Sequence, residues 1–129
     1  MKRLLLFFAV AFLLGSCAST QTVKEARGQG IKKMYNHPYE DVYQATLSAA
    51  EKQELKILEE NKDEGLILLS HGVTLWSWGE RIAVFLAEDS DSSTEVEIVS
   101  KPVVAPLNFP PDWASRLFTE IDQELGTAK

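Results

Sequence analysis

The first seventeen residues constrain this chain most, because their pattern indicates a segment that is not part of the folded domain. Met1-Lys2-Arg3 is basic, Leu4 to Leu14 is an unbroken apolar run, and Gly15-Ser16 leads into Cys17, the single cysteine. This order is that of a secretory signal peptide, and the apolar run is too short for a comfortable membrane span. We therefore predict that residues 1–16 are cleaved and that the fold begins after them.

The residues that end this segment, Leu14-Gly15-Ser16-Cys17, resemble the lipobox of bacterial lipoproteins. The resemblance implies cleavage before Cys17, a diacylglycerol on its sulfur and usually a further acyl chain on its new amine. It also implies a place in the cell envelope, and Ala18 in place of aspartate after the cysteine favours the outer membrane if the source is Gram-negative. The alternative is an ordinary signal peptide whose cysteine falls near the cleavage site.

The net charge and the single cysteine limit what the mature chain can bind and how it can be stabilised. Loss of Lys2 and Arg3 takes the formal net charge from −6 to about −8, which argues against nucleic acid and against electrostatic docking onto anionic lipids. We expect the membrane to be held through acyl chains on Cys17, since two or more chains anchor stably. Lipidation uses the one thiol, so a hydrophobic core must stabilise the domain without disulfides.

The polar stretch after the cysteine carries no apolar periodicity. Residues 18–30 read ASTQTVKEARGQG, with two glycines. We predict that residues 17–30 form a lipidated flexible tether with a reach of roughly 20 Å. Residues 31–126 are then expected to form a single domain.

Periodicity within that domain predicts an α+β fold. Apolar residues recur every three or four residues in the helices, and they alternate with polar ones in residues 94–101, whereas residues 81–88 are apolar on both faces. The expected strands are 31–35, 55–60, 66–70, 81–88 and 94–101, and the expected helices are 38–52 and 112–125. The order β-α-β-β-β-β-α, in which the first strand is weak, predicts an antiparallel sheet of about four strands with two helices packed on one face. It resembles short envelope lipoproteins of the helix-grip type.

Catalytic and metal-binding patterns are sparse. His37 and His71 are the two histidines, and both suit structural positions at a helix start and a strand end. Asp89-x-Asp91-x-Ser93-x-Glu95 resembles the start of a calcium loop but lacks its later glycine and glutamate. We predict no metal, no cofactor and no enzymatic activity. A hydrolase would require His71, a serine and a carboxylate in one cleft.

The most unusual stretch of the mature chain is residues 72–79, GVTLWSWG, which two glycines bracket. Tryptophan combines a large apolar body with an N–H group, so it suits interfaces. Trp76 and Trp78 either cap an open end of the core or form a contact surface, which Phe109 and Trp113 could join. Four prolines in residues 102–111 exclude a paired strand there.

These observations predict a membrane-anchored envelope lipoprotein that acts as a non-enzymatic protein-interaction module. Its contact residues would be Trp76, Trp78, Phe109 and Trp113. The alternative is a carrier of a small apolar ligand or lipid, with a cavity of roughly 300 Å³ or more between sheet and helix. A filled core with exposed tryptophans would favour the first hypothesis.

Overall fold

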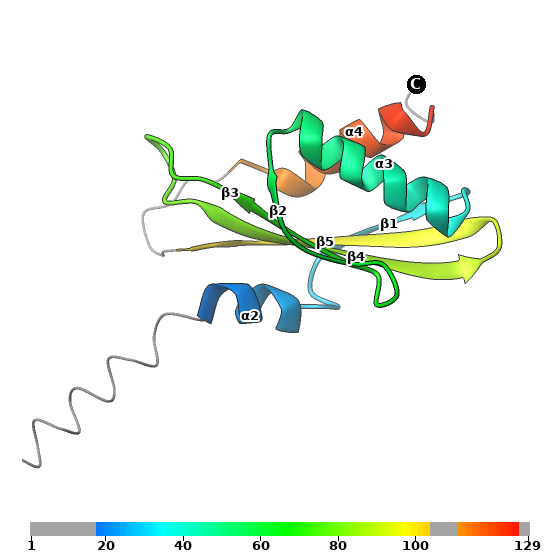
Figure 1. Cartoon of the computed structure of the whole chain (residues 1–129), viewed down its shortest axis with the longest axis horizontal. Coiled ribbons are helices and arrows are strands. Elements are labelled where there is room, and N and C mark those ends of the chain that lie inside the picture. Colours follow the sequence, from blue (N-terminus) through cyan, green and yellow to red (C-terminus); the bar gives the residue numbers. More distant parts are fainter. Residues whose placement is uncertain (1–17, 104–110, 127–129) are drawn as a thin grey trace, which may run out of the picture.

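The computed structural model describes residues 18–103 and 111–126, which form one antiparallel sheet with helices on both faces (Figure 1). The elements are α2 (Ala18–Glu25), β1 (Ile31–Tyr35), α3 (Tyr39–Lys52), β2 (Lys56–Asn61), β3 (Leu66–His71), β4 (Glu80–Ser90), β5 (Ser93–Pro102) and α4 (Trp113–Glu124). The predicted α+β class and antiparallel sheet are confirmed. Within the described residues, no helix has the length and apolar character that a membrane span requires.

The sheet has five strands, in the order β1-β5-β4-β3-β2, and not the four that were predicted. The additional strand is β1, which pairs with β5 from Ile31 opposite Ile98 to Tyr35 opposite Thr94. Tyr35 is the one fully buried side chain of β1, so the strand has little apolar pattern of its own. Its place depends on pairing with a strand more than sixty residues further along the chain.

Strand connections differ between the two ends of the sheet. Residues 62–65 and 91–92 make short turns at one end, which we call the turn end. Residues 72–79 connect β3 to β4 at the opposite end, which we call the loop end (Figure 1). The proline-rich stretch lies outside the described residues from 104 to 110.

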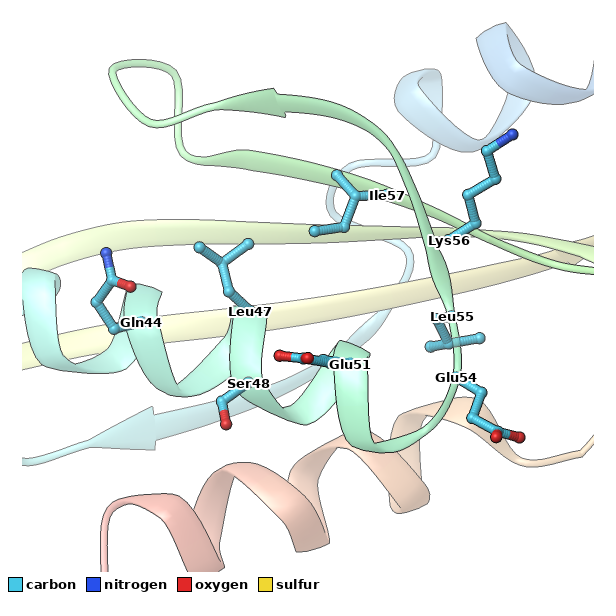
Figure 2. Close-up of a pocket in the computed structure, with 8 residues that line it drawn as sticks. All are labelled: Gln44, Leu47, Ser48, Glu51, Glu54, Leu55, Lys56 and Ile57. Carbon is cyan, nitrogen blue, oxygen red and sulfur yellow. The ribbon is translucent and has the colours of Figure 1, made fainter.

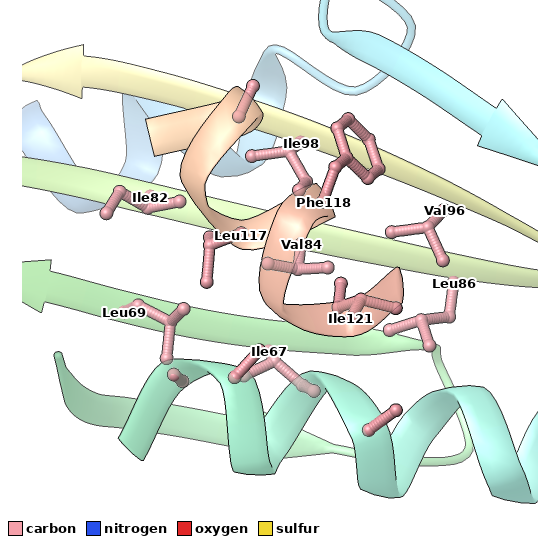
Figure 3. Packing of buried hydrophobic residues seen from close by; sticks show 14 of the residues in the cluster. Ile67, Leu69, Ile82, Val84, Leu86, Val96, Ile98, Leu117, Phe118 and Ile121 are labelled. Atoms are coloured by element: carbon pink, nitrogen blue, oxygen red, sulfur yellow. The ribbon is translucent and has the colours of Figure 1, made fainter. Parts of the chain in front are cut away.

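Helices α3 and α4 cover one face of the sheet, as predicted. Pro38 is extended and precedes α3, which ends in a Schellman motif: Leu55 N–H donates to Ala50 O and Glu54 N–H to Glu51 O. Their apolar faces and the facing strand residues form the main core (Figure 3). Labelled members of that core are Ile67, Leu69, Ile82, Val84, Leu86, Val96, Ile98, Leu117, Phe118 and Ile121.

Helix α2 packs on the opposite face, which corrects the prediction of a flexible tether for the described residues 18–30. Its Val23 and the following Ala26 are buried and form a second apolar cluster with strand residues. The strand members are Leu66, Leu68, Ala83, Phe85 and Val99. Two buried residues on one side of a short polar helix give too weak a periodic signal to predict it from sequence.

The turn after α2 is held by a buried carboxylate in the middle of the sheet. Glu97 Oε1 accepts hydrogen bonds from Gly28 N at 2.6 Å and from Gly30 N at 2.9 Å. Arg27 lies over the Phe85 ring at 4.6 Å and donates to Glu64 O at 3.1 Å. The segment that was predicted to hold the domain away from a membrane is therefore fixed to the domain.

Candidate functional site

The loop of residues 72–79 is the candidate functional site, because it exposes large apolar side chains that the fold does not bury. Val73 is 70% exposed, Leu75 95%, Trp76 74% and Trp78 58%. We call these four side chains the crest. The prediction that the two tryptophans are surface groups agrees with their exposure, and the alternative that they cap the core does not.

A buried carboxylate lies beneath the crest. Glu80, the first residue of β4, has no exposed surface. Its Oε2 lies 2.9 Å from His71 Nδ1 and accepts from Trp113 Nε1 at 3.4 Å, and its Oε1 accepts from the Ser77 hydroxyl. One side chain thus joins the two strand ends, the loop and the start of α4, which gives the loop a fixed base.

Backbone hydrogen bonds shape the loop above that base. Thr74 N–H donates to Ser77 O at 2.7 Å, and Gly79 N–H donates to Ser77 Oγ at 3.0 Å. Gly79 has φ +96°, and a Cβ there would lie 2.8 Å from His71 O, so the position requires glycine. The crest is therefore displayed on a turn that the buried Ser77 side chain ties to Glu80 and to Gly79.

Ser77, His71 and Glu80 are the three residue types of a catalytic triad, but their hydrogen bonds link them in a different order. In a catalytic triad the histidine lies between the serine and the carboxylate, and it takes the serine proton. Here Glu80 lies between Ser77 and His71, and the Ser77 hydroxyl donates to the carboxylate. Ser77 is also only 4% exposed. This arrangement serves to position the loop and offers no activated nucleophile.

The prediction that Trp113 belongs to the contact surface is wrong. Trp113 is 2% exposed, its ring packs against His71 with 4.8 Å between the ring centres, and its N–H group faces Glu80. It begins α4 directly after the capping residue Asp112, so its side chain enters the core at the loop end. Phe109 and Cys17, the predicted lipidation site, lie outside the described residues.

Sequence reasoning missed Glu80, although a signal for it exists. Glu80 has the same parity along β4 as Ile82 and Val84, which face the main core. A carboxylate at an inward position of an apolar strand requires partners, because burying it alone is costly. Its partners, at positions 71, 77 and 113, come from three separate segments, and the sequence does not show that they converge.

A surface groove lies between α3 and the start of β2 (Figure 2). Leu47 and Ile57 supply its apolar walls, while Gln44, Ser48 and Glu51 make much of the remainder polar. The groove is open to solvent. Among the described residues, no group of three or more His, Cys, Asp or Glu side chains is placed to hold a metal ion.

Comparisons with known proteins give similarity of fold alone. No protein-family model and no curated protein matches the chain. The solved adenylate sensor from AMP-activated protein kinase, in complex with the ribofuranotide ZMP, has a TM-score of 0.51 at 14% identity, over 71% of this chain and 94% of that one. The structure of Ara h 8.0201 has a TM-score of 0.39 at 15% identity, over 76% and 96% of the two chains.

Proposed function

We propose that this chain is a lipid-anchored, non-enzymatic interaction protein of the bacterial cell envelope, and that the crest is its contact surface. The observation that carries the proposal is the crest itself, four exposed apolar side chains on a loop with a buried polar base. Exposed apolar groups that gather on one ordered feature typically mark an interaction site. The signal and lipobox residues that end at Cys17 supply the anchor.

The contact role is tested by replacing Trp76 and Trp78 together with alanine. We expect crosslinking of the full-length protein to envelope components to fall strongly. Both side chains are more than half exposed, so the free energy of unfolding should change by less than about 1 kcal/mol. Unchanged crosslinking in a folded variant would contradict the proposal, and Val73→Ala with Leu75→Ala tests the other half of the crest.

The anchor is tested separately by Cys17→Ser. We expect this variant to lose acyl labelling and to leave the washed membrane fraction, because the acyl chains supply most of the membrane affinity. Membrane retention equal to that of the wild-type protein would refute lipidation at Cys17. Ser16→Ala is the matched control, since it keeps a small residue before the cysteine.

The carrier hypothesis remains the second candidate, together with the helix-grip-like sheet on which it depends. What favours the interaction protein is that side chains of α3 and α4 fill the space over the sheet, and that Glu51 and Glu54 line the α3–β2 groove. Saturable binding of a fluorescent fatty acid, unaffected by the Trp76 and Trp78 substitutions, would favour the carrier instead.

A further inference from the structure

A row of basic residues crosses the sheet at the loop end, on the face that α2 covers in part. Strand register places Lys56 opposite Ser70, Ser70 opposite Arg81, and Arg81 opposite Lys101. Residues directly opposite one another point to the same face of a sheet. Arg81 shares its face with Ala83, which packs under α2. We call Lys56, Arg81 and Lys101 the basic row.

The two lysines of the basic row lack the carboxylate partners that the other described lysines have. Every other lysine of the described residues pairs with a carboxylate: Lys24, Lys32, Lys33, Lys52 and Lys62. Neither lysine of the row has such a pair among the described residues, and Arg81 donates only to the main-chain oxygen of Glu80, at 3.4 Å. Figure 2 shows Lys56 pointing away from the groove, toward the α2 side. Lys56 and Lys101 thus remain available to an external anion, and the partly buried Arg81 lies between them in the register.

The row, the crest and the entry of the chain lie at one end of the molecule. His71 and Glu80, which bound the crest loop, directly follow Ser70 and precede Arg81, so one residue pair separates the row from the loop. Helix α2 begins at this same end (Figure 1). Cys17 directly precedes Ala18, the first residue of α2, in the sequence. An acyl chain on Cys17 would therefore bring this end of the domain against the bilayer.

We propose that the crest and the basic row together form a docking surface for the headgroup region of an anionic bilayer. This inference rests on the proposed function and names the partner of the crest. Tryptophan is favoured at the membrane interface, where its ring is half-buried and its N–H group hydrated. Each lysine near an anionic surface strengthens attachment by about fivefold. The net charge of the chain argued against such an attraction, because it does not show how the charges are distributed over the surface.

The position of the crest is tested with a photo-crosslinking residue at Trp76 in the full-length protein, within the intact envelope. The control places the same residue at Ser90, which is exposed at the turn end. We expect phospholipid adducts from position 76 and several-fold fewer from position 90. Protein adducts without lipid adducts at position 76, or equal lipid adducts at both positions, would overturn the docking proposal.

The charge contribution is tested with the purified, lipidated chain in phosphatidylcholine vesicles with and without phosphatidylglycerol. Quenching of tryptophan by brominated lipid reports the depth of the crest, because Trp113 is buried in the protein. We expect anionic lipid to increase quenching, and Lys56→Gln with Lys101→Gln to remove that increase. The control, Lys32→Gln with Lys62→Gln, changes the net charge equally at lysines that are paired elsewhere. Equal behaviour of the two double variants would overturn the role of the row.

Failure of docking can be told apart from failure of the anchor. If the wild-type protein stays in the membrane fraction but gives no lipid adduct at position 76, docking is wrong and the anchor stands. If the wild-type protein is absent from the membrane fraction, both proposals are contradicted.

Discussion

The loop end and the turn end of the sheet both connect neighbouring antiparallel strands, but they do so with different residues. At the turn end, four residues connect β2 to β3 and two connect β4 to β5. The exposed residues there are polar and include Asp63, Glu64, Glu88, Asp89 and Asp91. At the loop end, eight residues connect β3 to β4, and four of them are exposed apolar side chains. A strand connection therefore requires neither the length nor the apolar surface of the crest.

The two ends also differ in what lies beneath them. The residue 62–65 turn depends on the backbone, with Leu86 N–H donating to Gly65 O at 2.8 Å. The crest instead depends on the Glu80 carboxylate, which is buried in an apolar core. Burying a carboxylate is costly unless it is fully hydrogen-bonded. Loss of any one partner of Glu80 should therefore destabilise the domain. An ordered base of this kind is what the proposed contact role requires of the loop.

The largest effect that separates the two ends should come from Glu80→Ala. It leaves the Ser77 hydroxyl, the Trp113 N–H group and His71 without their common partner and opens a cavity. We expect the free energy of unfolding to fall by about 3 kcal/mol in urea denaturation. Glu88→Ala at the turn end should change it by less than about 0.5 kcal/mol. Similar losses in both variants would remove the distinction between the ends.

A smaller effect should separate the two glycines that bracket the loop. Gly79 has φ +96°, and an added Cβ would meet His71 O, whereas a Cβ at Gly72 meets nothing within 4 Å. We expect Gly79→Ala to lower the free energy of unfolding by about 2 kcal/mol and Gly72→Ala to leave it nearly unchanged. Thermal melts monitored by circular dichroism would measure both. An equal loss would mean that the loop is not held at Gly79.

The smallest effect concerns Asp112, which caps α4 next to Trp113. Hydrogen bonds from the Ser115 side chain and backbone lower the pKa of Asp112 below its usual value. A lowered pKa in the folded state stabilises the protein above the unfolded pKa of about 3.9, and that stabilisation is lost as the pH falls through the folded pKa. Asp112→Asn should therefore be less stable than the wild-type protein at pH 7 and nearly equal to it near pH 2. A difference independent of pH would exclude a contribution from the charge.

The main elements could be predicted because their signals are local. Each signal lies within one short window: the apolar runs of β3 and β4, the alternation in β5, and the three- and four-residue spacing in α3 and α4. Tyr35 is the one buried residue of β1, and Val23 is the one buried residue among the α2 side chains that the structure describes. Their structure depends on distant partners, which a single sequence does not identify.

The candidate site could also be predicted only where its signal is local in the sequence. Bracketing glycines and two tryptophans identified the crest from composition, because large apolar groups are unusual in a connection. The basic row was missed because its members are far apart in sequence and meet only through the strand register. Trp113 was misplaced because helical spacing shows that a face is apolar but not which segments it will meet.

The docking of α2 also links the order of synthesis to the order of folding. Synthesis proceeds from the N-terminus, so α2 leaves the ribosome long before its docking partners, which extend from Leu66 to Val99. Glu97, which holds the following turn, is separated from Gly28 by 69 residues. Such distant contacts form late in folding, after the closure of long loops. Helix α2 therefore precedes in the chain every strand that it packs on, and it cannot dock until β3, β4 and β5 have been made.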